Sequence, residues 1–233
     1  MYIYGKNVVR EKLSSGDKIR KAFVSERFRD NDILLELKKR KIKTSFVPGR
    51  ELDRKVDGLH QGIVLEIDDI RTYALEEVID NISQEYPTLV MLDHLEDPHN
   101  IGAIIRTCEA LGVEGIIIPN DRCASINATV VKTSAGAIEY IPIIRVVNLV
   151  QTIKKLKDKG YWIIGTDMEG EDYTTIDYKM PVCLIIGNEG KGISKLVADN
   201  CDYMASIPMK GKINSLNASV SLGIILSEIV SKR

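Results

Sequence analysis

The chain has 233 residues, of which 44% are hydrophobic and 28% are charged, and its formal net charge is -1. This composition is typical of a soluble globular protein and leaves little room for extended disorder, and the length is sufficient for one large or two small domains. No window approaches the roughly 18 apolar residues of a membrane helix, and the first residues carry no signal-peptide pattern. We therefore expect a cytoplasmic protein with no membrane partner.

The cysteines and histidines do not predict a metal centre. The three histidines are scattered, and the cysteines are far apart with no C-x-x-C pair. We expect reduced and mostly buried thiols at Cys108, Cys123, Cys183 and Cys201.

Charge is distributed unevenly along the chain. Residues 1–60 contain 16 Lys/Arg and 9 Asp/Glu, whereas the remainder contains 16 and 24. Two basic runs, KIRK at 18–21 and KKRKIK at 38–43, are compatible with contacts to nucleic-acid phosphates, or they are solvated helix faces. Charge alone leaves both interpretations open.

The spacing of apolar residues predicts a small α/β unit at the start of the chain. Strands are expected at 21–25, 43–48 and 62–67, and helices at 7–13 and 32–41.

A junction follows this unit. The segment 71–87, RTYALEEVIDNISQEYP, is amphipathic and ends in a proline. We therefore expect a first domain at 1–70, a linker at 71–86 and a second domain at 87–233.

The second part alternates strands and helices to its end. The expected strands are continuous apolar runs, which is typical of a parallel sheet covered by helices on both faces. They lie at 89–95, 115–119, 141–146, 161–167, 182–187 and 203–208, and helices are expected to about Leu111 and at 129–138, 148–160 and 218–230.

Ligands of open parallel sheets bind at the carboxyl ends of the strands, which singles out four loops. These are DHLEDPHNIG, TDMEGEDY, GNEGKGIS and PMKGKINSLNAS. The glycines of GNEGKGIS fit neither the dinucleotide-binding nor the phosphate-loop spacing, but they indicate a tight turn with Glu189 at its centre. Ser215 and Asn217 precede the last helix, and Ser215, Asn217 and Ser219 are all plausible caps, although the helix needs only one.

Arg106 occurs in a helix that otherwise looks buried. It shares a helix face with residues 99, 102 and 103, while isoleucines at 101, 104 and 105 face the core. Because Gly102 and Ala103 are small, we expect Arg106 to lie along a cleared surface near a positive helix end, suited to a phosphate. A structural salt bridge is the alternative.

Three motifs together resemble those of the SpoU/TrmH family, RNA ribose 2'-O-methyltransferases of the SPOUT superfamily. They are N-x-G-x-x-x-R-T-x-x-x-x-G at 100–112, I-I-G-N-E-G-x-G at 185–192 and I-P-M-x-G-x-x-x-S-L-N-x-S at 207–219. IYGKNVVREKL at 3–13 and LHQGIVLE at 59–66 are similar to the first domain of the RlmB-type members, which methylate a guanosine of 23S rRNA. The resemblance covers essentially the whole chain.

The resemblance implies an α/β fold: a carboxy-terminal SPOUT domain with a parallel sheet and a deep trefoil knot, preceded by a small α/β RNA-binding domain resembling a ribosomal-protein fold. It implies S-adenosylmethionine as cofactor, and a homodimer in which an arginine of one chain completes the partner's site. The implied catalytic or substrate-positioning residues are Asn100, Arg106, Glu189, Ser215 and Asn217, and the implied cofactor contacts are Gly187, Ile207 and Leu216, with Thr166 and Met209.

A guanidinium stays protonated at any working pH, so Arg106 is not expected to act as a base. Our hypothesis is that Arg106 holds the substrate phosphate and stabilises charge on the 2'-oxygen, while Glu189 orients Asn100 or Arg106 or relays the proton. Two alternatives to a 23S rRNA substrate stay open. One is a guanosine of tRNA, as in TrmH-type members, which usually lack a domain like 1–70, and the other is a non-catalytic RNA-binding protein.

Overall fold

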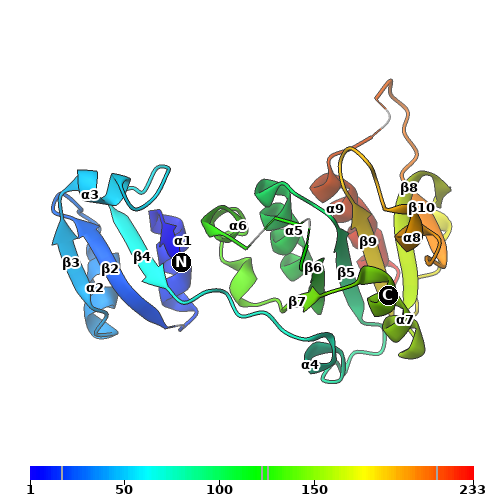
Figure 1. Ribbon diagram of the computed structural model, residues 1–233, viewed down its shortest axis with the longest axis horizontal. Coiled ribbons are helices and arrows are strands. Elements are labelled where there is room, and N and C mark those ends of the chain that lie inside the picture. The colour runs from blue at the N-terminus through cyan, green and yellow to red at the C-terminus, as the bar shows by residue number, and fades with distance from the viewer. Residues whose placement is uncertain (17, 122, 125, 214) are drawn as a thin grey trace.

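The computed structural model describes residues 1–16, 18–121, 123–124, 126–213 and 215–233, and these form two separate β-sheets (Figure 1). None of the described helices is long and apolar enough to cross a membrane. In chain order the elements are β1 (Tyr2–Tyr4), α1 (Lys6–Ser14), β2 (Ile19–Ser25), α2 (Asn31–Lys39), β3 (Thr44–Val47), α3 (Gly49–Asp53), β4 (Ile63–Ile67), α4 (Leu75–Ile79), β5 (Thr88–Asp93), α5 (Pro98–Ala110), β6 (Gly115–Pro119), α6 (Ala128–Thr133), η1 (Ala137–Glu139), β7 (Ile143–Val146), α7 (Leu149–Asp158), β8 (Trp162–Asp172), η2 (Tyr173–Thr175), β9 (Val182–Gly187), α8 (Lys195–Ala198), β10 (Tyr203–Ser206) and α9 (Ala218–Ser231).

The first sheet is mixed and has the order β1-β4-β2-β3. β4 is antiparallel to both β1 and β2, and β3 is parallel to β2. Apolar residues such as Val9 of α1 and Ile33 of α2 pack with Val24 on one face of this sheet. Phe23 and Leu52 pack on the other face.

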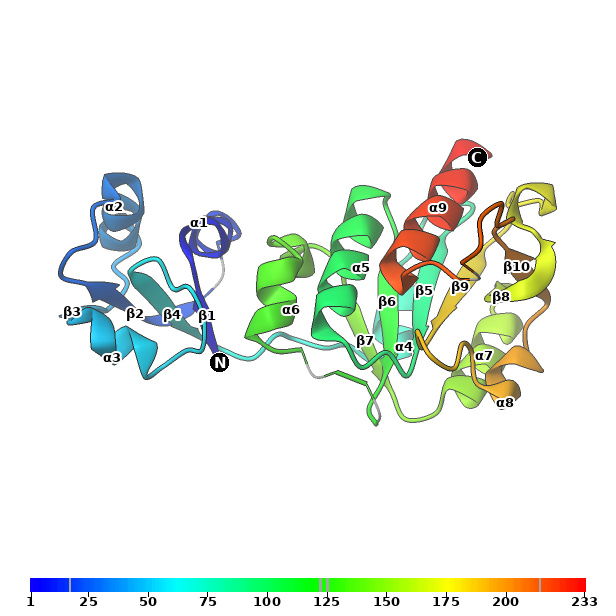
Figure 2. The same cartoon turned by 90° about the horizontal axis from the view of Figure 1, so that it is seen from above.

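The second sheet has the order β10-β8-β9-β5-β6-β7, and every pairing in it is parallel, as the apolar runs predicted. Alternate residues of each strand enter two different cores because successive side chains point to opposite faces. In β5, Val90 belongs to the core that contains residues of α5 and α9, and Met91 belongs to the core that contains residues of α4 and α7. Helices therefore cover both faces (Figure 2).

β8 is longer than the sequence predicted. It runs through the segment expected to be a loop and pairs with β10 twice, first Met204 with Gly165 and then, after a register shift, Ala205 with Glu171. The chain returns to β10 at Gly170, where an added Cβ would lie 2.2 Å from the carbonyl oxygen of Met204. Residues 166–170 thus leave the sheet as a bulge at its carboxyl end.

The helix expected at 129–138 is split into α6 and η1. Ala135 has φ 50° and Gly136 has φ 90°, so two consecutive residues leave helical geometry. The prediction of one continuous helix was wrong because a positive φ at an alanine has no sequence signal.

The segment between the two sheets is joined to the second. The main-chain N–H of Tyr73 donates to the Ile143 oxygen at 2.9 Å, and Arg145 N–H donates to the Tyr73 oxygen at 3.0 Å. The following helix, α4, buries Leu75 and Val78 against the same sheet. The amphipathic pattern of 71–87 is therefore explained by packing on one face.

The first sheet is docked on α6 and η1 of the second part. Lys12 Nζ of α1 lies 2.8 Å from Glu139 Oε1, and these side chains are only 7% and 11% exposed. An added Cβ on Gly136 would lie 2.8 Å from Glu11 Cβ, so α1 approaches this turn closely. Lys132 of α6 lies over the Tyr4 ring, 5.3 Å from its centroid. Both ribbon views show α1 facing α6 (Figures 1 and 2).

Candidate active site

The bulge of β8 and the loops that follow β9 and β10 line a cavity of about 710 Å³ at the carboxyl end of the second sheet. This is the position expected for a ligand of an open parallel sheet. Its described lining combines main chain of 187–192, the bulge of β8, the segment after β10 and the first turns of α9.

Three predicted catalytic residues meet at the rim of this cavity. Asn100, in the first turn of α5, is 8% exposed and donates from Nδ2 to Glu189 Oε1. Its Oδ1 accepts from Asn217 Nδ2 at 2.8 Å. The Asn100 amide thus serves as donor to Glu189 and as acceptor from Asn217, which lies 117 positions further along the chain.

Asn217 is the cap of α9. Its Oδ1 accepts from Ser219 N–H at 2.9 Å and from Ser219 Oγ at 2.6 Å, so the amide group faces the helix with one end and Asn100 with the other. Ser215 has no such capping role and lines the cavity. Of the three residues considered as caps, Asn217 is the cap, Ser219 bonds to it, and Ser215 lies in the cavity lining, where it can contact a ligand.

The loop after β9 is folded on itself and held at both ends. An added Cβ on Gly187 would lie 2.2 Å from the Gly192 carbonyl carbon, so only glycine fits at this turn. Asn188 donates to the His94 oxygen at 3.1 Å. The buried carboxylate of Asp93 accepts from Ser194 N–H at 2.6 Å through Oδ2.

Asp93 and Asn188 were not predicted as site residues. The only sequence signal for Asp93 is a carboxylate directly after the apolar run LVML, at the carboxyl end of a strand. Asn188 lies between two predicted residues, and its Oδ1 also accepts from the Gly190 and Lys191 N–H groups, at 3.0 and 3.3 Å. Together they fix the turn that carries Glu189.

The cavity suits a cofactor of the size of S-adenosylmethionine. Its volume lies in the usual range for small-molecule pockets, and its lining joins apolar side chains to main-chain groups of a glycine turn. All five predicted cofactor contacts line it, namely Thr166, Gly187, Ile207, Met209 and Leu216. The Thr166 hydroxyl donates to the Ile185 oxygen at 3.1 Å, which fixes the start of the β8 bulge.

Arg106 is not joined to this cluster within the chain. Its side chain is exposed, and no ion pair or hydrogen bond is seen for it among the described residues. The prediction that Gly102 leaves an open surface beside Arg106 was wrong, because α6 packs against Gly102. An added Cβ on Gly102 would lie 2.5 Å from Thr133 Cβ. The isoleucines at 101, 104 and 105 are buried as expected.

All four cysteines are free, with Cys108 and Cys183 buried and Cys123 and Cys201 half-buried. Burial raises the pKa of Cys123 and of Cys201 to about 11. In the part of the chain that the structure describes, no group of three or more His, Cys, Asp or Glu side chains is placed to hold a metal ion.

Comparison with known proteins agrees with this geometry. A model of the SpoU rRNA Methylase family matches residues 87–227, and one described as RNA 2'-O ribose methyltransferase substrate binding matches residues 2–73. YacO of Bacillus subtilis (strain 168), which is named for the TrmH family of tRNA/rRNA methyltransferases, is 41% identical over 238 residues, covering 100% of this chain and 96% of YacO.

Two solved structures with bound AdoMet are similar over nearly the whole chain. The SpoU methyltransferase AviRb from Streptomyces viridochromogenes has a TM-score of 0.84 at 25% identity, covering 100% of this chain and 90% of AviRb. An rRNA methyltransferase from Sinorhizobium meliloti has a TM-score of 0.79 at 29% identity, covering 98% of this chain and 85% of that one.

Proposed function

The chain belongs to the SpoU family of S-adenosylmethionine-dependent RNA methyltransferases, and on this premise we propose that it methylates a ribose 2'-hydroxyl of 23S rRNA, at a guanosine. The observation that carries the proposal is the hydrogen-bonded cluster of Asn100, Glu189 and Asn217 at the rim of a cofactor-sized cavity. A cytoplasmic location fits such a substrate. With the family we also infer a deep trefoil knot in the second domain.

The polar cluster can hold a ribose against the cavity. When bound, S-adenosylmethionine supplies the methyl group. Asn100 is oriented by Glu189 and Asn217, so its position is fixed before substrate arrives, which is the condition for efficient electrostatic catalysis. Ser215 adds a hydroxyl at the same rim. We assign the proton of the 2'-hydroxyl to Glu189, the exposed carboxylate of the cluster.

Arg106 has a different place in the proposal. Since it is exposed and outside its own cavity, we infer a homodimer in which Arg106 of one protomer reaches the partner's site and holds the substrate phosphate there. Val220 and Val230 of α9 are 48% and 46% exposed, which gives this helix apolar surface for a second copy. Light scattering at micromolar concentration should give the mass of a dimer, and a monomer would contradict the inference.

Ribosomal RNA is favoured by the first domain. Residues 2–73 match a substrate-binding model, and the rRNA methyltransferase from Sinorhizobium meliloti aligns over 98% of the chain, including this part. The basic balance of residues 1–60 supports RNA contacts that weaken with salt. A guanosine of tRNA is the second candidate, because YacO is named for both RNA classes.

The test is transfer of a labelled methyl group from S-adenosylmethionine to protein-free 23S rRNA and, separately, to bulk tRNA, followed by mass spectrometry of the nucleosides. We expect 2'-O-methylguanosine in the 23S sample alone. Label in tRNA alone would keep the enzyme and overturn the proposed substrate. Label in neither, without cofactor binding, would favour a non-catalytic RNA-binding protein.

The role of Arg106 is tested in the same assay with Arg106→Lys. This variant keeps the charge but loses the planar, two-pronged donor that matches a phosphate. We expect turnover at saturating RNA to fall by about tenfold or more, as for other lost charge-stabilising donors. Near-normal turnover would exclude the bidentate role.

A further inference from the structure

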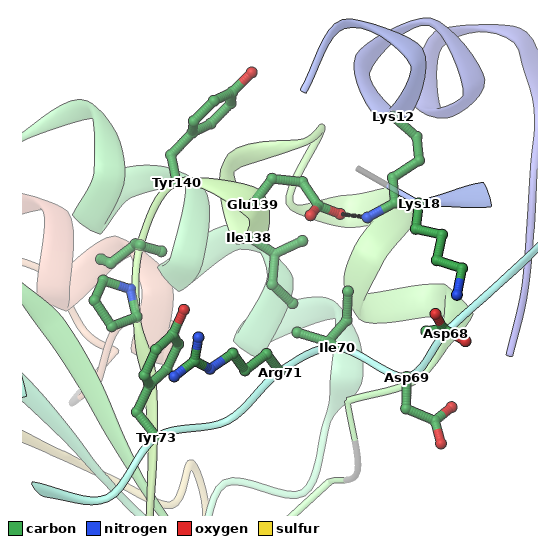
Figure 3. Close-up of a pocket in the computed structure, with 12 residues that line it drawn as sticks. Lys12, Lys18, Asp68, Asp69, Ile70, Arg71, Tyr73, Ile138, Glu139 and Tyr140 are labelled. Atoms are coloured by element: carbon green, nitrogen blue, oxygen red, sulfur yellow. Dashed lines mark hydrogen bonds and ion pairs between the residues drawn. The ribbon is translucent and has the colours of Figure 1, made fainter. Parts of the chain in front are cut away.

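A second cavity, of about 450 Å³, lies between the two domains (Figure 3). It shares no lining residue with the cavity at the active site. It is lined by three parts of the chain: α1 and the turn after it, the segment 68–73, and the residues around η1. None of the three motifs at 100–112, 185–192 and 207–219 contributes to it, and the proposed catalytic chemistry does not use it. Its walls include Ile70, Ile138 and Pro142, so part of its surface is apolar.

Arg71 provides a flat surface in this cleft. Its guanidinium carbon lies 4.3 Å from the centroid of the Tyr73 ring, and its Nη2 lies 3.5 Å from Glu77 Oε1. Two contacts therefore orient a side chain that is still 70% exposed. In Figure 3 the guanidinium lies beside the Tyr73 ring, on the side of Ile70. A guanidinium held in one plane is a stacking surface for another flat group.

The charges around the cleft favour a neutral ligand. The described lining has three cationic side chains, Lys12, Lys18 and Arg71, and three anionic ones, Asp68, Asp69 and Glu139. A balanced set gives no net attraction for a phosphate. Because Lys12 and Glu139 are buried and paired with each other, the hydrogen-bond donors and acceptors toward a ligand come from the more exposed Lys18, Asp68 and Asp69. This combination of a flat platform, apolar walls and mixed polar groups matches a nucleobase.

The cleft is formed before any ligand binds. One wall is fixed by the main-chain pairing of Tyr73 with β7, and the other by the buried ion pair of Lys12 with Glu139, which Figure 3 shows. A site that needs no rearrangement loses less free energy to ordering when it binds.

We propose that the cleft between the domains binds one unstacked nucleobase of the RNA substrate, with the guanidinium of Arg71 as its stacking platform. This proposal rests on RNA being the substrate. It places a readout of single-stranded RNA between the first domain and the active site, since sequence-specific RNA recognition targets bases that leave the helix.

The test measures binding of short single-stranded oligoribonucleotides to the full chain by fluorescence anisotropy over a range of salt concentrations. The variants are Arg71→Ala, Arg71→Lys and Ile70→Trp, which fills the cleft without changing charge. Loss of one stacked base should weaken binding about fivefold to a hundredfold in all three. Arg71→Lys should leave the salt dependence unchanged, because the number of neutralised phosphates is the same.

Lys154→Arg is the control for a Lys/Arg exchange, since Lys154 is exposed on α7 and lies outside both the cleft and the basic first domain. It should bind as the original chain does. Wild-type affinity in Arg71→Lys would show that only the charge matters and would overturn the stacking proposal, as would unchanged binding in Ile70→Trp. Cofactor binding should be normal in every variant, which excludes misfolding.

Ultraviolet crosslinking gives a positive readout. We expect RNA adducts on peptides that contain Tyr73 or Tyr140, two aromatic residues of the cleft, and their loss in Ile70→Trp. Adducts that lie only elsewhere would contradict the proposal. Methyl transfer by the wild-type chain tests the proposed function separately. If the wild-type chain methylates RNA and the cleft variants bind RNA normally, the nucleobase proposal alone is refuted. If the chain binds no RNA, both the nucleobase proposal and the proposed function are refuted.

Discussion

Asn100 holds the rim of the cofactor-sized cavity in one arrangement because its amide donates to Glu189 and accepts from Asn217. Both partners are exposed, whereas Asn100 is buried. Replacing Asn100 would therefore remove the group that fixes Glu189 and Asn217 relative to each other.

For Asn100→Ala we expect turnover to fall by about a hundredfold or more, within the range measured for lost donors that orient a reacting group. The dissociation constant of S-adenosylmethionine should change by less than about threefold, because Asn100 is not among the residues lining the cavity. Equilibrium dialysis and single-turnover methylation separate the two quantities. Asn200→Ala is the control, because among the described residues the Asn200 side chain hydrogen-bonds to the Leu196 oxygen of the helix just before it and not to the cluster. A similar loss there would show a general effect on folding.

The thiols should react slowly and in two classes. Cys123 and Cys201 are half-buried with pKa values of about 11, so their thiolate fraction and alkylation rate should rise about tenfold per pH unit from neutral pH towards that value. Burial raises the pKa of Cys108 and of Cys183 further, and these two should remain unlabelled until the chain unfolds. Mass spectrometry after iodoacetamide treatment at two pH values checks this, and fast labelling at neutral pH would refute it.

At the scale of the elements, α5 and α6 can approach closely only because Gly102 has no side chain. An added Cβ would lie 2.5 Å from Thr133 Cβ and 3.0 Å from the Val130 oxygen, which is main chain and cannot turn aside. Gly223 of α9 is the opposite case, since its nearest neighbour is Thr107 Cγ2 at 3.7 Å.

We expect Gly102→Ala to lower the free energy of unfolding by about 1 to 3 kcal/mol, the usual cost of overpacking. Gly223→Ala should be neutral or raise it by up to about 1 kcal/mol, because alanine is the better helix former. Urea unfolding of both variants makes the comparison. If both variants changed the free energy of unfolding by the same amount, helix propensity and not the α5–α6 contact would determine the effect of Gly102→Ala.

Much of the second sheet could be predicted because each strand is an apolar run buried on both faces. The path of β8 past Thr166 could not be predicted from the sequence. It depends on a register shift against β10, where Gly170 lies close to Met204. Short elements such as β1, α3 and α8 have too few residues to show a period.

The site was predictable to the extent that the motifs fix it. They include Asn100, Glu189 and Asn217, which hydrogen bonds join in the structure. They do not include the buried Asp93, whose carboxylate accepts from the Ser194 N–H and holds the loop after β9 in place. For Arg106, one chain shows only an exposed side chain. The proposed role of Arg106 in a partner's site comes from the family resemblance, since the residues around Arg106 in one protomer do not indicate it.

At the scale of the whole molecule, the two domains are held together by a buried ion pair and not only by the connecting chain. Lys12 and Glu139 are almost fully buried, and replacing one partner by a like charge would leave two ammonium groups facing each other. Breaking a buried pair costs about 3 to 5 kcal/mol, which is large for a small interface.

Glu139→Lys should therefore release the first domain while both cores stay folded. Small-angle X-ray scattering should show a larger radius of gyration than the original chain, with unchanged circular dichroism. Asp158→Lys, a reversal at an exposed position of α7, is the matched control. An unchanged radius in Glu139→Lys would mean that the other contacts between the domains, such as the packing around Gly136 and of Ala128 against the first sheet, are sufficient to hold them together.

The pairing of Tyr73 with β7 also determines where this protein can be divided. A fragment that starts at residue 87 would lose both the Tyr73 bridge and α4, so main-chain groups at the edge of β7 would be unpaired, and the core that Leu75 and Val78 cover would be exposed to water. Such a fragment should aggregate, whereas one that starts before Arg71 keeps its edge protected. The segment that connects the two sheets therefore folds as part of the second sheet's domain.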